Sequence, residues 1–232
     1  QRTRPEEIGF LASPQMSNED LWVLRRLAAE LGVRNVDFRV PARAQGDEDN
    51  FLIRADKNPN SRGAELIGIT PGGIAPGQGG LDAAGMLRAA SLKQIKLLWV
   101  FHHDLGAAAW PEAEVLEGLE GAETVIFQGT NANDASTRAH LVLPSAAYVE
   151  REGTFTNFEG RVQRFRTALT PPGEAWPDWM ILSFVGKALG FQDPVFAAER
   201  SEQVFNALAK SVPAFAGMTY RGIADSGAMV KA

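Results

Sequence analysis

The residues best suited to chemistry are His102, His103 and Asp104, which follow a strongly apolar run at residues 97–101. Open parallel sheets bind ligands at the carboxyl ends of their strands, so this position favours a ligand contact. Adjacent side chains on an extended strand point to opposite faces, so the two imidazoles cannot hold one metal ion without distortion. His140 is the only other histidine. The sequence therefore predicts no metal site, and it favours an interface or a satisfied core position for the two neighbouring histidines.

A glycine-rich stretch at residues 70–80 is the second candidate, because Gly77 and Gly79 form a G-x-G pattern. The dinucleotide fingerprint requires a third glycine three residues later, where this chain has Asp82. The strand signal before the loop, at residues 66–69, is weak. We therefore predict a connecting loop here in preference to a nucleotide site.

Side chains for nucleophilic or paired-acid catalysis are poorly placed. Ser145 lies in a Pro-Ser-Ala sequence, without the G-x-S-x-G signature or a nearby acid–base partner. Glu150 and Glu152 share one side of an extended segment, but Arg151 between them favours a solvated face. No catalytic residue is predicted in this chain.

Apolar strands alternating with amphipathic helices must position these side chains. The expected strands are residues 8–12, 36–40, 66–69, 95–101, 124–128 and 141–143. The expected helices are residues 17–32, 51–55, 81–92, 111–121, 133–140, 178–189 and 200–210. This order predicts an α/β fold, a Rossmann-like parallel sheet with helices on both faces, followed by an extended arm and a helical tail.

The texture of the sequence changes near Tyr148, which suggests two parts. We predict a Rossmann-like domain at residues 1–148, and at residues 149–232 an arm with C-terminal helices that pack on this domain or on partners. The arm is rich in hydrogen-bonding groups, and Phe155 and Phe158 would be its apolar anchors. Such a segment is costly to order unless it packs against something.

Composition excludes several classes of function. The 232 residues include 23 Lys and Arg and 28 Asp and Glu, a net charge of −5 that predicts no nucleic-acid partner. The chain has no cysteine, which excludes disulfides and iron–sulfur ligation by its own side chains. Its apolar runs fall far short of the ~20 residues of a membrane helix, so we expect no direct membrane insertion. Because the sequence starts at Gln1, we expect a processed chain or a piece of a longer one.

Three segments resemble the molybdopterin oxidoreductase superfamily. Residues 141–163, LVLPSAAYVEREGTFTNFEGRVQ, resemble its late LP-x-x-x-x-E-x-x-GT-x-x-N-x-EGR-x-Q stretch. Residues 171–179, PPGEAWPDW, are similar to its continuation, and residues 17–37 to its TNEE…LG-x-x-NVD segment. The resemblance covers most of residues 8–190.

Two further segments, ADKNPNSRG at residues 55–63 and KLLWVF at residues 96–101, resemble the large iron–sulfur (75 kDa) subunit of NADH:quinone oxidoreductase, respiratory complex I. This resemblance implies a non-catalytic scaffold part of the peripheral arm, which supports electron transfer from NADH to quinone by subunit packing. It also implies no cofactor in this chain, with iron–sulfur clusters upstream or in partner subunits. Molybdenum enzymes of the superfamily carry a second nucleotide-binding-like domain for which residues 41–80 leave no room.

The implied partners are other peripheral-arm subunits and the cluster-bearing domains of the large iron–sulfur subunit. The implied location is the cytoplasmic side of the inner membrane in bacteria, or the matrix side in mitochondria. The residues expected at these interfaces are Arg151, Phe155, Phe158, Arg161 and Arg164.

Two alternatives remain open. One is a fragment of a molybdopterin-dependent oxidoreductase such as formate dehydrogenase. The resemblance then implies that the arm binds molybdopterin through Thr154, Asn157, Glu159, Gly160, Arg161 and Gln163. The other is a free-standing α/β enzyme or binding protein, which would need a closed site with convergent polar groups that the sequence does not show.

Overall fold

The computed structural model describes residues 3–40, 49, 51, 53–74, 77, 79–108 and 110–231. Its centre is a five-stranded sheet with the order β2-β1-β3-β4-β5, and every pairing in it is parallel. The strands are β1 (Ile8–Leu11), β2 (Asn35–Asp37), β3 (Leu97–Phe101), β4 (Thr124–Gly129) and β5 (Leu141–Pro144). The predicted α/β, Rossmann-like fold is confirmed, and the strand order reverses between β1 and β3.

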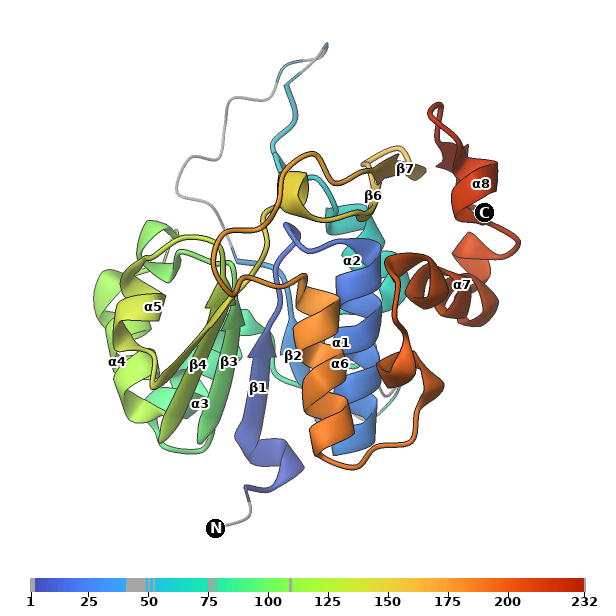
Figure 1. Cartoon of the computed structure of the whole chain (residues 1–232). Coiled ribbons are helices and arrows are strands. Elements are labelled where there is room, and N and C mark those ends of the chain that lie inside the picture. The colour runs from blue at the N-terminus through green and yellow to red at the C-terminus, as the bar shows by residue number, and fades with distance from the viewer. Residues whose placement is uncertain are drawn as a thin grey trace.

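Helices cover both faces of the sheet, as Figure 1 shows. α1 (Asn18–Leu31) and α6 (Asp178–Ala188) pack against each other on one face, and α3 (Ala83–Ser91) and α4 (Glu112–Gly121) form the pair on the other. Alternation along each strand divides the apolar residues between two cores. In β3, for example, Trp99 belongs to the core under α1 and α6.

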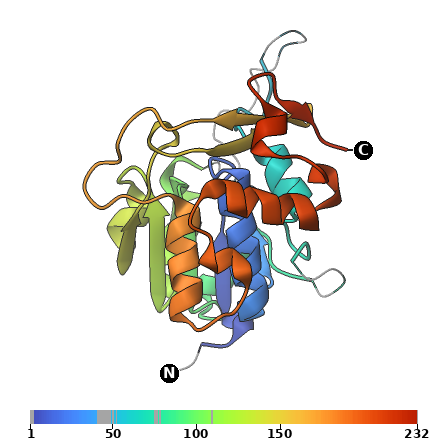
Figure 2. The same ribbon diagram turned by 45° about the vertical axis from the view of Figure 1, so that its right-hand side comes forward.

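The arm forms an antiparallel hairpin that lies across the carboxyl ends of the main sheet (Figure 2). Its strands are β6 (Gly153–Thr156) and β7 (Arg161–Phe165), and β8 (Ala228–Met229) joins β7. The remaining helices are α2 (Ser61–Ile67), α5 (Asp134–Arg138), α7 (Ser201–Ser211) and α8 (Tyr220–Ile223). The single-turn 3₁₀ helices are η1 (Pro5–Glu7), η2 (Leu105–Ala107), η3 (Tyr148–Glu150), η4 (Pro194–Ala197) and η5 (Pro213–Phe215).

Local sequence explains how α1 is placed. Ser17 and Asp20 form a reciprocal capping box at its start, and Gly32, with a φ of 71°, ends it in the left-handed conformation that glycine adopts without strain. The Ser-x-x-Asp signal in the sequence predicts this start correctly. The start matters because α1 begins at the carboxyl edge of the sheet, beside the arm.

Several expected elements differ from the structure. The strand expected at residues 66–69 is wrong, because the chain there completes α2, which Gly68 ends at a φ of 84°. The helix expected at residues 51–55 is also wrong, since residues 51 and 53–55 are not helical, whereas residue 52 lies outside the described residues. β2 ends at Asp37, short of the expected residue 40. The boundary near residue 148 stays a prediction.

Within the described ranges, no helix combines the length and the apolar character needed to cross a membrane.

Candidate functional site

The carboxyl ends of β3, β4 and β5 meet at Asp178, the first residue of α6. One carboxylate oxygen, Oδ1, accepts hydrogen bonds from Ser145 Oγ at 2.6 Å and from Gln128 Nε2 at 2.8 Å. The other, Oδ2, lies 2.9 Å from His102 Nε2. Each of these three partners ends or follows a different strand, so one fully buried carboxylate joins three strands.

Arg151 connects the arm to the same place. Its side chain is 2% exposed, its Nη1 forms an ion pair with Asp20, and its Nη2 lies 3.9 Å from Asp178 Oδ2. Asp20 also accepts hydrogen bonds from Ser17 Oγ at 2.7 Å and from Trp179 N at 2.9 Å. We call the whole group the strand-end cluster; it consists of Asp20, His102, Gln128, Ser145, Arg151 and Asp178.

The charges in the strand-end cluster act in both directions: burial and the nearby Asp178 carboxylate raise the pKa of Asp20, whereas Arg151 lowers it. Burial would raise the pKa of Asp178, but the hydrogen-bonded His102 ring and the Arg151 guanidinium outweigh it and hold that pKa below its ordinary value. His102 has a φ of 55°, a left-handed conformation that is uncommon for residues other than glycine. Such a conformation persists where neighbouring contacts determine it, and the bond to Asp178 is such a contact.

The histidine pair is held by hydrogen bonds. His103 Nε2 donates to the Ala12 carbonyl oxygen at 2.7 Å, and burial lowers the pKa of His103 to about 4, so its ring is neutral near pH 7. The two rings contact different partners, although the reason differs from the expected one, because β3 ends at Phe101 and His102 is in the left-handed conformation instead of an extended one. No group of three or more His, Cys, Asp or Glu among the described residues could hold a metal ion.

The cluster contains the three residue types of a hydrolase triad, but the hydrogen bonds do not connect them in the order serine–histidine–aspartate. Ser145 Oγ donates to Asp178, and Asp178 also holds the His102 ring, so the imidazole is not placed to remove the serine proton. Ser145 is also 4% exposed. The arrangement positions the strand ends and does not activate a nucleophile.

Glu19 joins the arm to α1 one residue away from this cluster. Its carboxylate accepts hydrogen bonds from Thr154 N at 2.8 Å, from Thr154 Oγ1 at 2.9 Å and from Tyr220 Oη at 2.9 Å. Burial raises the pKa of Glu19 to about 7, although the hydrogen bonds from Thr154 oppose this rise. One carboxyl group therefore holds α1, β6 and α8 together.

Asn18 and Asn60 complete the attachment of β6. Asn18 Nδ2 donates to the hydroxyl oxygens of Thr154 and Thr156, each at 3.0 Å. Asn60 Oδ1 accepts from Thr156 N at 2.7 Å. All four side chains are fully buried, and the helical Gly63 leaves room for the two asparagines that a Cβ would occupy. We call Asn18, Glu19, Asn60, Thr154 and Thr156 the arm anchor.

The predicted interface residues of the arm have varied surroundings. The Phe155 ring stacks on Phe165 with centroids 4.6 Å apart. Phe158 is 60% exposed at the hairpin turn, and the Arg54 guanidinium lies 4.4 Å from its ring centroid. Arg151 is buried inside the strand-end cluster. Contact of these residues with a partner stays a prediction, and Phe158 is the most accessible of the three.

The other two predicted interface residues also bond within the chain. Arg161 Nη1 donates to the Ser226 carbonyl oxygen at 3.2 Å. Arg164 forms an ion pair of 2.9 Å with Glu152 and lies 4.3 Å from the centroid of the Tyr220 ring. Neither is fully buried, so both retain surface for a partner, and their predicted role is untested.

The arm residues expected to bind molybdopterin do not form one convergent set of donors. Thr154 is buried against Glu19, and Asn157 Oδ1 accepts the backbone N–H groups of Glu159 and Arg161 at the hairpin turn. Gly160 forms that turn at a φ of 86°, while Glu159 and Gln163 are exposed. These residues therefore do not fit a pterin as a group, and their contact with one stays a prediction.

A cavity of about 900 Å³ opens at the carboxyl ends of β1 and β2. Arg39 and Lys57 lie in its lining, together with Trp110. Arg39 Nε forms an ion pair of 2.9 Å with Asp37, and Lys57 Nζ donates to the Arg54 carbonyl oxygen. This cavity lies at the edge where doubly wound sheets bind ligands, and its lining combines these two cations with the carboxylates of Asp37, Asp56 and Asp82. The sequence did not reveal it, because the residues come from separate segments.

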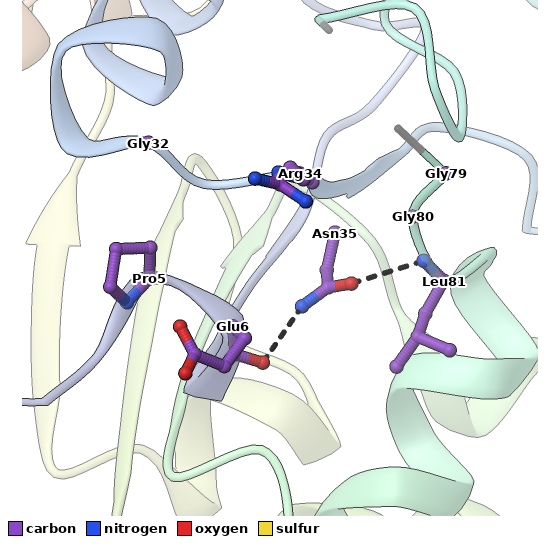
Figure 3. Close-up of a pocket in the computed structure, with 8 residues that line it drawn as sticks. All are labelled: Pro5, Glu6, Gly32, Arg34, Asn35, Gly79, Gly80 and Leu81. Carbon is purple, nitrogen blue, oxygen red and sulfur yellow. Dashed lines mark hydrogen bonds between the residues drawn. The ribbon is translucent and has the colours of Figure 1, made fainter. Parts of the chain in front are cut away.

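A second cavity, of about 570 Å³, lies at the opposite, amino end of the sheet (Figure 3). Its polar centre is Asn35, whose Nδ2 donates to the Glu6 carbonyl oxygen at 3.1 Å. Asn35 Oδ1 accepts from Leu81 N at 3.0 Å. The side chain thus closes the outer edge of β2 and has no remaining strong donor for a ligand.

The strand order defines a doubly wound, Rossmann-like α/β domain. Residues 56–188 match the family model described as Molybdopterin oxidoreductase, and the chain belongs to this family.

Curated relatives agree with this membership. The chain is 33% identical over 135 residues to the F420-dependent formate dehydrogenase subunit alpha of Methanocaldococcus jannaschii, a match that covers 58% of this chain and 20% of that protein. It is 36% identical over 144 residues to a nitrate reductase of Synechocystis sp., covering 60% and 20%. The chain thus spans about a fifth of the length of these relatives.

Among solved structures, acetylene hydratase from Pelobacter acetylenicus matches with a TM-score of 0.54 and 16% identity, over 66% of this chain and 21% of that one. At this identity the match supports the fold alone.

Proposed function

We propose that the chain is part of a larger molybdopterin-dependent oxidoreductase subunit, of the type represented by formate dehydrogenase. The sequence left this possibility open as an alternative, and the named relatives favour it over a complex I scaffold. The structural observation that carries the proposal is the cavity beside Arg39 and Lys57. Molybdopterin carries a phosphate group, and Lys57 would pair with it at the ligand-binding edge of the sheet, where Arg39 already pairs with Asp37.

In this proposal the arm has a supporting role. The strand-end cluster and the arm anchor fix the hairpin above the sheet. The redox chemistry would come from the cofactor, and this chain would supply binding and orientation.

Metal content of the full-length subunit tests the proposal. We expect molybdenum or tungsten in the purified protein. Lys57→Ala should lower the cofactor content severalfold, and because Lys57 is exposed, the variant should still fold. Lys210→Ala, at an exposed position on α7, is the matched control and should leave the content unchanged. A full-length protein free of both metals would contradict the proposal.

A second candidate is the cofactor-free scaffold of complex I, with no cofactor in this chain. The hydrogen bonds of the arm anchor favour it, because its hydroxyl and amide groups bond to one another and are not available to a cofactor. The short connection between β2 and α2, which lacks the second nucleotide-binding domain, also favours it. The partners would then be peripheral-arm subunits, on the cytoplasmic or the matrix side of the membrane.

Association of the subunits tests this second candidate. Mass spectrometry of the purified assembly should find complex I subunits in fixed ratio, and Phe158→Ala should weaken their association. Leu92→Ala replaces another apolar side chain, 68% exposed, and should change nothing. Equal co-purification of the Phe158 variant and the control would remove Phe158 from the interface.

A further inference from the structure

The outer edge of β5 is an open strand edge. β5 pairs only with β4 among the described strands. At the end of β5, Ser145 N donates to Gly129 O of β4, and in a parallel ladder alternate residues point the same way. The N–H and C=O groups of Leu141 and Leu143 therefore face β4, and those of Val142 are directed away from the sheet. Beyond Pro144 the edge is covered, because Trp176 forms an isolated parallel bridge with Ser145.

The side chains of this edge are apolar and exposed. Leu141 and Val142 are each 48% exposed, on opposite faces of the strand, and β5 has no charged residue. Natural sheets protect open edges with lysine, proline or a covering segment. Only Pro144 serves this purpose here, at the end that Trp176 already covers. A long-lived open edge of this composition favours the addition of another strand.

A strongly acidic surface lies at the same end of the sheet. α4 and α5 are beside β4 in Figure 1, and α4 carries no lysine or arginine. Its exposed carboxylates, with one just beyond its end, are Glu112, Glu114, Glu117, Glu120 and Glu123. None of them forms an ion pair with another described residue.

We propose that the β5 edge docks an extended, apolar segment flanked by lysine or arginine, contributed by a separate subunit of the assembly. The outward N–H and C=O groups of Val142 would bind the backbone of this segment, and the side chains of Leu141 and Val142 would pack against it on the two faces. The α4 carboxylates would pair with the flanking cations. This inference rests on the proposed function only in that the chain works inside a larger assembly.

Charge argues against a second copy of this chain as the occupant. Pairing of two β5 edges would bring two α4 helices, each with unpaired carboxylates, toward one another, and like charges at an interface oppose association. A basic segment gains from the same surface. The electrostatic complement of the edge is therefore a different polypeptide.

Carbodiimide cross-linking of the full-length protein in its native assembly tests the inference. The reagent joins carboxylates to lysines in direct contact, so we expect cross-links from Glu117 or Glu120 to lysines of another subunit. Cross-links to a second copy, to another part of the same polypeptide, or to none would overturn the inference. Metal content reports on the proposed function alone, so the two failures are distinguishable.

Charge reversal supplies an independent measurement. Glu120→Lys should weaken association with the cross-linked subunit about tenfold, equivalent to about 1.4 kcal/mol. Glu30→Lys, an exposed acid at the far end of α1, is the matched control and should have no effect. Equal affinity of both variants would overturn the role of α4. Because both positions are exposed on helices, neither substitution should prevent folding.

Hydrogen exchange tests the strand itself without any substitution. In the assembly, the amide of Val142, which faces away from β4, should exchange at least tenfold more slowly than in the chain separated from its partner. Equal exchange in the two states would overturn strand addition.

Discussion

Two regions of this molecule differ in whether their hydrogen-bonding groups are bonded within the chain. Around the strand-end cluster and the arm anchor, charged and polar side chains are fully buried and bonded to one another. At the β5 edge, the side chains are apolar and half-exposed while the backbone is open. A buried polar group without a partner is costly, so almost every such group in the first region has a partner within the chain; Gln128 Oε1 is buried without one. The second has no such constraint.

The opposite edge of the sheet, at β2, is closed by side-chain hydrogen bonds. At β2, Asn35 bonds to Leu81 N, and Asp37 Oδ2 accepts from Ala83 N. The backbone of Gly80 lies so close to the Arg34 carbonyl that a Cβ would clash with it. An edge closed by side chains and an edge left open therefore exist in one sheet, which supports an external partner for β5.

Removal of the buried Arg151 guanidinium should produce the largest change in stability. Arg151→Ala leaves Asp20 and Asp178 buried without their counter-ion, so we expect the free energy of unfolding to fall by about 3–5 kcal/mol. Urea denaturation of the variant measures this loss.

Arg166→Ala is the matched control, because Arg166 pairs with Asp225 at the surface, where the side chains are 68% and 97% exposed. A loss within about 0.5 kcal/mol is expected there. Equal losses at both positions would show that burial does not determine how much these ion pairs contribute to the free energy of unfolding.

The charge of Glu19 should give the next largest effect, as a dependence of stability on pH. Its pKa is about 7 in the folded chain and 4.5 ordinarily, so folding favours the protonated form. Its contribution is fully present below pH 4.5 and is lost as the pH rises through 7. The free energy of unfolding should fall by up to roughly 3 kcal/mol from this group across that window.

His103 acts in the opposite direction, since its pKa of about 4 lies below the ordinary 6.5. Its contribution is present above pH 6.5 and is lost as the pH falls through 4. The difference between wild type and Glu19→Gln at each pH cancels this contribution. Glu30→Gln, at an exposed position, is the control; a Glu19 difference that is flat with pH would refute the assignment.

Opening of the closed edge should have an intermediate effect. Asn35→Ala removes hydrogen bonds to Glu6 O, Ile8 O and Leu81 N, and we expect a loss of about 1–3 kcal/mol. Hydrogen exchange at the Leu81 amide should accelerate in the variant. Asn131→Ala serves as the control, because Asn131 is exposed and its side chain donates only to Thr130. Unchanged exchange at Leu81 would mean that the backbone alone closes β2.

Much of the fold follows from local sequence, whereas the site does not. Apolar runs at β1, β3 and β4 identify the parallel strands, and the Ser17 signal identifies the start of α1, because both depend on neighbours in sequence. The partners Arg151 and Asp20 are separated by 131 residues, and Thr154 and Glu19 by 135. Single-sequence periodicity contains no information on such pairs, so the sequence predicts an extended arm that packs on the domain or on partners but does not identify the residues it contacts.

The same reasoning explains the errors in α2 and β2. Residues 66–69 have the apolar character of a short strand, but α2 extends to Ile67 because Ala64 and Ile67 are buried in the core under α1. β2 stops at Asp37 because the Asp37 carboxylate accepts from the backbone N–H groups of Phe38 and Arg39. Tertiary packing and a local side-chain bond thus override the periodic pattern.

The smallest expected change in stability is at the open β5 edge, and it gives the most direct test of the difference between this edge and the buried arm anchor. Val142→Thr keeps the β-branched shape and adds a hydroxyl group, and because Val142 is 48% exposed, that hydroxyl group can still reach water. The isolated chain should therefore change by less than about 0.5 kcal/mol. Val125→Thr makes the same exchange in β4, where the side chain is fully buried, and should cost about 1–3 kcal/mol. In the assembly the order should reverse for association, since Val142→Thr buries a hydroxyl group only when a strand covers β5. Val142→Thr that leaves association unchanged would mean that β5 is a tolerated open edge, and the contrast with the arm anchor would then reflect stability alone.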